Sequence, residues 1–313
     1  MKAVILAGGF ATRLWPLSEK RAKPLLPVAG KEIASHLVEK LPEKVEIIIS
    51  TNKQFESSFK KWKEKKFPKR KIRILVEPSS SENEKKGAIG GISYAIESCK
   101  IDEDLVVLAG DNLFTFDLAH FVSQYNGNAL VAVYDIESLE EAKKYGVVDV
   151  KDNKIINFEE KPDSPKSSTV STLCYILPKK SLPYLSEFAK TGADNAGDFI
   201  AYLVKKSPFD VEPYIFSGSW FDVGSFDAYL EANKKLQKTP IIDKTAKVKN
   251  SQISGSSVIG EGAKIINSTI EDSIIMEGCK IEDSRIKDSV VDFESSVKNT
   301  SLEKQLIRNN TII

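Results

Sequence analysis

Apolar and polar residues follow two different rhythms along this chain of 313 residues. In the first part, short apolar runs alternate with segments of helical character. This alternation predicts an α/β fold, with a Rossmann-like, mixed and mostly parallel sheet that carries helices on both faces. The expected strands are Lys2–Leu6, 45–50, Ile72–Val76 and Leu105–Leu108, and the expected helices are Lys31–Leu41 and Gly87–Ser98.

From Leu130 the apolar runs become shorter and indicate strands of mixed direction that extend the same sheet. A helix from Phe226 to Gln237 is expected to close this domain, because Thr239-Pro240 follows it as a turn signal. The predicted domains are therefore 1–238 and 239–313. The additional strands are Leu130–Tyr134, Gly146–Val150, Lys154–Glu159 and Ser171–Leu177.

The second rhythm begins after this boundary, where aliphatic residues recur every five or six positions between corners rich in Ser, Asn, Asp and Gly. Every third aliphatic advances by 17, 16, 16 and 16 residues. Three short strands per coil describe a parallel β-helix, whereas a plain antiparallel sheet would show strict alternation. The residues that mark this register are Val248, Ile265, Ile281, Val297 and Ile313.

Charge and composition limit the classes of partner that this chain is expected to bind. The chain carries 45 basic and 44 acidic side chains, so bulk attraction to nucleic acid or to an anionic membrane is not expected. Neither a signal peptide nor a membrane-spanning apolar run is found, which predicts a cytoplasmic protein. The three cysteines and two histidines show no disulfide or zinc spacing. A phosphate site must therefore be a local cluster.

The strongest chemical signal is the turn after the first strand, which reads Leu-Ala-Gly-Gly-Phe-Ala-Thr-Arg-Leu-Trp-Pro-Leu over residues 6–17. Glycines let backbone N–H groups approach phosphate oxygens closely. Arg13 offers a planar fork for a phosphate group, and Lys23, in Lys-Pro-Leu-Leu-Pro, adds a compact charge. Neither the Walker P-loop nor the dinucleotide Gly fingerprint is present. This pattern predicts a triphosphate cradle.

The turn and the Lys-Pro-Leu-Leu-Pro string resemble the nucleotide-binding signature of the sugar-1-phosphate nucleotidylyltransferases. These enzymes join a nucleoside triphosphate to a sugar 1-phosphate and release pyrophosphate. The similarity covers nearly the whole chain, because Ala-Gly-Asp-Asn at 109–112, Phe-Glu-Glu-Lys-Pro at 158–162 and Trp-Phe-Asp-Val-Gly-Ser at 220–225 follow in the family's order. The resemblance implies an activity like that of glucose-1-phosphate thymidylyltransferase and a left-handed β-helix.

The same resemblance implies the roles of individual residues. Asp111 and Asp222 would share one Mg²⁺, an ion that prefers a few carboxylates together with phosphate oxygens and waters. The catalytic cations would be Arg13, Lys23 and Lys161, acting on the leaving pyrophosphate, the α-phosphate and the attacking phosphate. The nucleotide-binding residues would be Leu6, Ala7, Gly8, Gly9, Thr12, Arg13, Glu77 and Gly87, and the sugar-binding residues Asn112, Glu160, Lys161 and Thr172.

Several departures from the family pattern keep alternatives open. Ala11 stands where the family usually has glycine, and Leu173 follows Thr172 where a glycine is usual. Glu77 could accept hydrogen bonds from guanine, so a mannose-1-phosphate guanylyltransferase is an alternative. A non-catalytic relative that senses sugar nucleotides is another. An acyltransferase is disfavoured because no histidine follows His120. Unpaired strand edges at the last coil predict a homo-oligomer.

Overall fold

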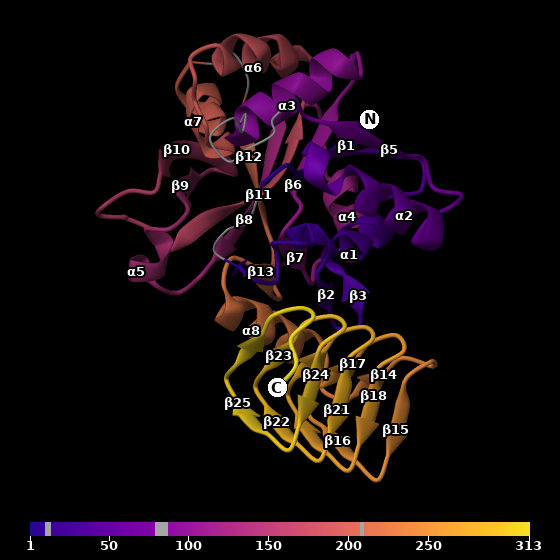
Figure 1. The fold of residues 1–313 in the computed structure, drawn as a ribbon. Helices are drawn as coiled ribbons and strands as arrows, with labels where there is room; N and C mark the ends of the chain where they lie inside the picture. The colour runs from indigo at the N-terminus through magenta and orange to yellow at the C-terminus, as the bar shows by residue number, and fades with distance from the viewer. Residues whose placement is uncertain (10–13, 79–86, 207–209) are drawn as a thin grey trace. The chain divides into compact units, whose positions relative to one another are not determined.

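The computed structural model describes residues 1–9, 14–78, 87–206 and 210–313. The chain divides into two compact units (Figure 1). The first contains residues 1–10 and 34–220, and the second contains residues 11–33 and 221–313. The expected end of a catalytic domain at residue 238 stays a prediction. Among the described residues, no helix is long and apolar enough to cross a membrane.

The centre of the first unit is a group of parallel strands. β1 (Lys2–Ala7) pairs in parallel with β4 (Glu46–Thr51) and with β6 (Leu105–Ala109), and β4 pairs in parallel with β5 (Ile72–Val76). All five residues of β6 are buried. Because successive side chains point to opposite faces, this burial means that both faces of the sheet are covered.

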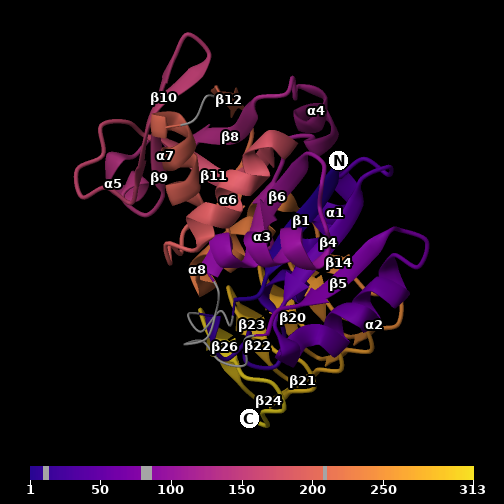
Figure 2. The same ribbon diagram turned by 90° about the horizontal axis from the view of Figure 1, so that it is seen from above.

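The helices of the first unit supply that cover (Figures 1 and 2). One apolar cluster joins side chains of β1, β4 and β6 to α3 (Gly87–Ser98), α6 and α7. The helices α1 and α2 lie toward the opposite face. The α/β class predicted from the sequence is therefore confirmed. The bounds of the other helices are α1 Ile33–Lys40, α2 Glu56–Lys66, α4 Leu118–Ser123, α5 Leu139–Ala142, α6 Leu182–Ala189 and α7 Ala196–Lys206.

The rest of the sheet is mixed and is organised by β11 (Thr169–Leu177). This strand pairs antiparallel with β6, with β8 (Ala129–Asp135) and with β9 (Gly146–Lys151). β9 pairs antiparallel with β10 (Lys154–Glu160), and β8 pairs in parallel with β12 (Val211–Ile215). The short elements of this unit are η3 Lys53–Phe55, β7 Asn112–Phe114 and η5 Lys179–Ser181.

Some elements are not indicated by the hydrophobic pattern. α2 buries only Phe59 and Trp62 among lysines, so it has almost no apolar stripe. α7 begins with Ala196-Gly197, and glycine weakens the sequence signal for a helix. β12 contains Pro213, which is confined to edge strands, and β12 lies at an end of the sheet order. Tertiary packing therefore determines the secondary structure of these segments.

The second unit contains the repeat. The strands of the repeat form three separate parallel sheets, as a three-sided β-helix requires. Val248 pairs with Ile265, Ile265 with Ile281, and Ile281 with Val297, so the predicted register is confirmed. The strands are β14 Ile241–Ile242, β15 Lys247–Lys249, β16 Gln252–Ser254, β17 Val258–Ile259, β18 Lys264–Ile266, β19 Thr269–Glu271, β20 Ile274–Ile275, β21 Lys280–Glu282, β22 Arg285–Lys287, β23 Val290–Val291, β24 Ser296–Lys298, β25 Ser301–Glu303 and β26 Leu306–Ile307.

The polar corners explain why the coils stack. One corner of successive coils has a residue with positive φ, and these residues are Asn250, Asn267, Asp283 and Asn299. Asn and Asp tolerate this left-handed conformation better than other side chains do. The hydroxyl of Ser251 accepts from the N–H of Ser268 at 3.0 Å, and the hydroxyl of Ser268 accepts from Ser284 N–H at 3.1 Å. Each corner thus satisfies the backbone of the next coil.

The remaining elements of the second unit lie outside the repeat. α8 (Phe226–Leu236) begins after Ser225, whose hydroxyl accepts from the N–H of Ala228 at 3.2 Å, so the helix expected at 226–237 is confirmed. The unit also holds η2 (Lys23–Leu25), β2 (Pro27–Val28) and β3 (Lys31–Glu32). β13 (Trp220–Asp222) crosses the boundary between the two units.

Candidate active site

The turn after β1 packs against a buried carboxylate. Glu77, directly after β5, is only 5% exposed, and the hydroxyl of Ser50 donates to its Oε1 at 2.8 Å. A Cβ atom at Gly8 would lie 2.6 Å from the same oxygen, and one at Gly91 in α3 would lie 3.3 Å from it. Any side chain at Gly8 would therefore displace Glu77, so the glycine and the carboxylate form one site.

Side chains after β4 hold the backbone of this turn. The Asn52 side-chain amide donates to the carbonyl of Gly8 at 3.1 Å, and the hydroxyl of Thr51 donates to the carbonyl of Ala7 at 3.3 Å. These bonds satisfy buried acceptors and fix the direction in which the chain leaves the sheet. The backbone of Ala7 and Gly8 is consequently held in place, and its expected contact with phosphate stays a prediction.

The structure describes some of the other expected nucleotide-binding residues and not others. Among the residues that the structure describes, none would lie within 4 Å of a Cβ atom at Gly9. The side chain of Leu6 lies against Gly91, where a Cβ atom would be 3.6 Å from Leu6 Cδ2. Thr12 and Arg13 lie outside the described residues. Their expected roles stay predictions.

Gly87 begins α3 in a conformation that favours glycine, with φ of +65°. A Cβ atom there would overlap the side chain of Asp194. The N–H of Ala88 donates to the carbonyl of Asp194 at 2.8 Å, which attaches the loop before α7 to the first turn of α3. Gly87 is therefore required by its close approach to this loop.

A chain of hydrogen bonds orients Asp111, which follows β6. The side-chain amide of Asn112 donates to Asp111 Oδ1 at 2.9 Å, and the indole N–H of Trp220 donates to Asn112 Oδ1 at 2.6 Å. Asn112 is 4% exposed, so this chain is largely shielded from water. Asn112 thus positions Asp111, and its expected contact with the sugar stays a prediction.

Two glycines surround the carboxylate of Glu160 at the end of β10. A Cβ atom at Gly197 would overlap Glu160 Oε2, and one at Gly146 would lie 3.0 Å from it. Burial raises the pKa of Glu160 above its ordinary value, Lys161 opposes the rise, and Asp198 adds to it. The two glycines are not among the predicted site residues, although a glycine that opens a strand and one within a helix are signals of close approach.

The chain bends at Lys161, directly after Glu160. The φ of Lys161 is +47°, its N–H donates to the carbonyl of Tyr145 at 3.0 Å, and its Nζ lies 3.8 Å from Glu160 Oε1. The ring of Tyr145 meets the ring of Trp220 edge-on, with centroids 4.9 Å apart. Trp220 therefore contacts both the residue that orients Asp111 and the residue that holds the Lys161 turn.

The expected sugar-binding residue Thr172 is 1% exposed, and its hydroxyl donates to the carbonyl of Ala132 at 3.0 Å. The neighbouring Ser171 hydroxyl shares a hydrogen bond of 2.9 Å with the hydroxyl of Tyr175. Neither of these two residues is among the site residues predicted from the sequence. Ser171 pairs with Gly146 across the sheet, so this strand runs beside the Glu160 cluster. Whether Thr172 contacts a sugar stays a prediction.

Lys23 and Asp222 belong to the second unit. Lys23 is half-buried in η2, and the carbonyl of Asp222 accepts from the N–H of Gly224 at 2.8 Å. Within the described part of the chain, no three Asp, Glu, His or Cys side chains gather as a metal site. Asp111 still suits Mg²⁺, because that ion takes one or two carboxylates and completes its shell with phosphate oxygens and waters.

The family comparison decides the class of protein. The sequence model described as nucleotidyl transferase matches residues 2–239. The chain belongs to the nucleotidyl transferase family. It is 33% identical over 271 residues to the bifunctional protein GlmU of Methanocaldococcus jannaschii, covering 84% of this chain and 61% of that protein. The chain therefore spans about three fifths of this relative's length.

Two further similarities support the membership of this nucleotidyl transferase. A Sulfolobus acidocaldarius protein assigned as a mannose-1-phosphate guanyltransferase is 27% identical over 283 residues, which cover 86% of this chain and 76% of that protein. A solved structure from Bacillus anthracis, assigned as a glucose-1-phosphate thymidylyltransferase, has a TM-score of 0.65 at 27% identity. It covers 74% of this chain and 94% of its own.

Proposed function

We propose that this nucleotidyl transferase joins a nucleoside triphosphate to a sugar 1-phosphate and releases pyrophosphate, as a glucose-1-phosphate thymidylyltransferase does. One observation carries the proposal most strongly. Trp220 bonds to Asn112 beside Asp111 and packs on Tyr145, which holds the turn of Lys161. Three segments that resemble the family's metal and sugar-phosphate motifs thus meet at one tryptophan.

The chain's residues have separable tasks in the proposed reaction. The attacking sugar phosphate is already an anion, so positioning and charge stabilisation are needed rather than a general base. Lys161 orients the sugar phosphate, Lys23 stabilises the α-phosphate, and Arg13 draws charge onto the leaving pyrophosphate. Asp111 and Asp222 would hold Mg²⁺, which would supply positive charge to the phosphates.

Glu160 is proposed to bind sugar hydroxyls. Its carboxylate is held against Gly146 and Gly197, so its position is set by backbone rather than by flexible side chains. A carboxylate can accept hydrogen bonds from two hydroxyl groups. Because burial raises the pKa of Glu160, sugar binding is expected to weaken as the pH falls through that raised value.

Glu77 favours a second candidate, a mannose-1-phosphate guanylyltransferase. The buried carboxylate lies behind the Gly8 turn and accepts from Ser50. A carboxylate can accept from the N1 and N2 hydrogens of guanine, whereas it would meet the O4 oxygen of thymine unfavourably. The choice of nucleobase is therefore the finer question that the assay must answer.

The test is pyrophosphate release from four nucleoside triphosphates, each paired with glucose, mannose and N-acetylglucosamine 1-phosphates. We expect turnover that needs Mg²⁺ and is abolished by excess chelator. Preference for dTTP with glucose 1-phosphate supports the first candidate, and preference for GTP with mannose 1-phosphate supports the second. Binding of these ligands without any pyrophosphate would instead indicate the sensing relative. Homo-oligomerisation and a cytoplasmic location stay predictions.

A further inference from the structure

Residues 14–33, here called the signature segment, follow the glycine turn and carry Lys23. They belong to the same compact unit as the β-helix. Between Leu14 and Ile33, which are themselves helical, the segment has little regular structure: the single turn of η2 and the two-residue strands β2 and β3. Its conformation must therefore be set by what it packs against.

The first attachment lies two residues before Lys23. The guanidinium of Arg21 forms an ion pair with the carboxylate of Glu277 in the β-helix. The same guanidinium lies over the ring of Phe293, with its Cζ 5.2 Å from the ring centroid. A planar guanidinium can use its edge for a carboxylate and its face for an aromatic ring together, and lysine cannot. A second ion pair joins Glu19 to Arg308.

The second attachment lies just after η2 and uses α8. The hydroxyl of Tyr229 donates to the carbonyl of Pro27 at 2.6 Å. Asn233 accepts from the N–H of Ala29 at 2.9 Å through Oδ1, and its amide donates to the carbonyl of Ser256 in the β-helix at 2.7 Å. Tyr229 and Asn233 are fully buried. Asn233 therefore ties the signature segment and the β-helix together with one side chain.

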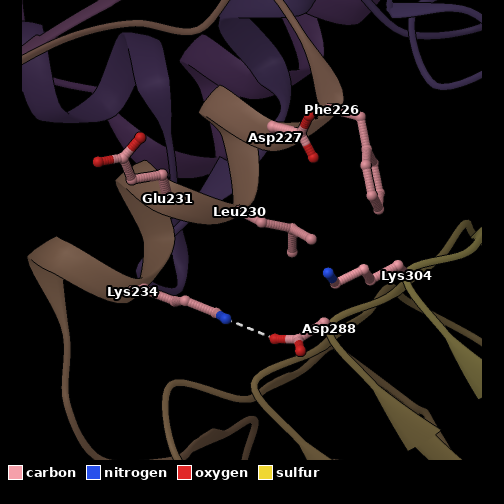
Figure 3. A pocket seen from close by; sticks show the side chains of 7 residues that line it. All are labelled: Phe226, Asp227, Leu230, Glu231, Lys234, Asp288 and Lys304. Carbon is pink, nitrogen blue, oxygen red and sulfur yellow. Dashed lines mark hydrogen bonds and ion pairs between the residues drawn. The ribbon is translucent and has the colours of Figure 1, made fainter.

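α8 is itself fixed to the β-helix (Figure 3). Lys234 forms an ion pair with Asp288 and lies 3.8 Å from a carboxylate oxygen of Asp272. Phe226 and Leu230 extend from α8 into the groove that also receives Lys304 of the β-helix. The attachment points on either side of Lys23 thus lead to one body, whose parallel coils share an aliphatic core.

We propose that the β-helix is the scaffold that positions Lys23, with Arg21 and Asn233 as positioning residues on its two sides. This inference rests on the proposed function, because it matters for turnover only if Lys23 acts on the nucleotide phosphates. A cation misplaced by about 1 Å can lose on the order of 10²-fold in rate. The β-helix thereby contributes to the reaction through Lys23, without any chemistry of its own.

The test uses Glu277→Gln and Arg21→Ala in the full chain. The matched control is Glu282→Gln, which removes the 3.0 Å ion pair with Lys298 inside the β-helix and does not touch the signature segment. Hydrogen exchange of residues 14–33, with the rest of the β-helix as internal reference, measures the attachment. We expect exchange in this segment to rise about tenfold in both variants and to stay unchanged in the control, since tenfold corresponds to about 1.4 kcal/mol.

Kinetics measure the consequence. We expect kcat/KM for the triphosphate to fall about tenfold while the KM for the sugar 1-phosphate stays within twofold, because Lys23 serves the nucleotide. The charge exchange Arg21→Glu with Glu277→Arg should recover part of the loss. Unchanged exchange in the segment, or equal losses in the control, overturns the inference. If exchange rises in the two variants but the wild-type protein releases no pyrophosphate from any substrate pair, the proposed function is overturned and the attachment stands.

Discussion

The β-helix and the α/β unit are built by opposite means. In the β-helix, one local rule returns every 16 or 17 residues, and the residues that it brings together are always one coil apart. In the α/β unit, the groups around Trp220 come from positions as far apart as Asn112 and Lys161. The repeat therefore specifies the β-helix through contacts between neighbouring coils. The candidate site depends instead on the packing of segments that are distant in the sequence.

The two regions also differ in the types of residue that adopt positive φ values. Positive φ values in the β-helix fall mainly on Asn, Asp and Gly, which adopt them easily. In the α/β unit, Lys161 and Leu173 adopt positive φ beside the candidate site. Strained residues of this kind persist only where surrounding structure imposes them, and they gather at functional sites. Substitutions at three positions test the comparison between the two units.

The largest effect is expected at Asp111. Asp111→Asn keeps an oxygen that can accept from Asn112 and removes the charge expected to hold Mg²⁺. We expect pyrophosphate release to fall by roughly 10³-fold, in the range seen when one electrostatic stabiliser is removed. The midpoint of urea unfolding should change little, since the hydrogen-bond chain through Trp220 is retained.

The control for Asp111 is Asp102→Asn, at an exposed aspartate that pairs with Lys179 at 2.8 Å on the surface of the same unit. Exposed ion pairs contribute about 0–1 kcal/mol, so this variant should keep both its stability and its turnover. Turnover of Asp111→Asn above a tenth of the wild-type rate would contradict the assignment of Asp111 to the metal.

The same contrast explains what sequence could predict. The β-helix register was predictable because Val248, Ile265 and Ile281 obey a period that is visible locally. The strand ends at Gly8 and Asp111 were predictable because buried apolar runs stop there. Their neighbours were not. Nothing local connects Trp220 with Asn112, because that contact depends on the packing of distant segments.

Glu160 and Thr172 also show that the sequence does not reveal which residues contact a predicted site residue. The motif around Glu160 was recognisable, but its support by Gly197 joins the end of a strand to the start of a helix that the pattern did not predict. The resemblance implies that Thr172 binds the sugar, and in the structure its hydroxyl donates to the carbonyl of Ala132 on the neighbouring strand. Residue types could be predicted, whereas their hydrogen-bond partners could not.

An intermediate effect is expected at Asp292, where the β-helix departs from its own repeat. The preceding coil has Met276 in the equivalent buried position, one period of 16 residues earlier. Asp292 is 1% exposed, and one of its carboxylate oxygens has no hydrogen-bond partner in the described structure. Burial raises its pKa from the ordinary value of 3.8 to about 6, despite the nearby guanidinium of Arg21.

The sign of the resulting pH dependence is fixed by that raised pKa. The folded protein holds the Asp292 proton more tightly than the unfolded chain does, so this stabilisation is complete below pH 3.8 and is lost as the pH rises through about 6. Asp292→Asn resembles the protonated form. We expect it to unfold with a free energy about 2 kcal/mol higher than wild type at pH 8, and to show no gain at pH 4.

Urea unfolding at the two pH values measures this difference, with Asp288→Asn as a comparison at a carboxylate that is already paired with Lys234. That variant should lose stability at pH 8 rather than gain it, because Lys234 loses the nearer of its two carboxylates. Equal stability of wild type and Asp292→Asn at both pH values would show that the buried carboxylate does not strain the β-helix.

The smallest effect, at Leu173, separates strain from packing. Leu173 has φ of +50° within the register shift of β11 between Ser171 and Tyr175. Ala and Gly substitutions remove nearly the same side-chain contacts, so their difference reports the backbone alone. In an ordinary strand Gly is less stable than Ala by about 0.5–1 kcal/mol, whereas in the left-handed region the order reverses by about 1 kcal/mol. We therefore expect Leu173→Gly to unfold at a higher urea concentration than Leu173→Ala.

The control is the same pair of substitutions at Val150, a half-exposed position of β9, where Ala should be more stable than Gly. If Ala is more stable than Gly at both positions, Leu173 carries no backbone strain.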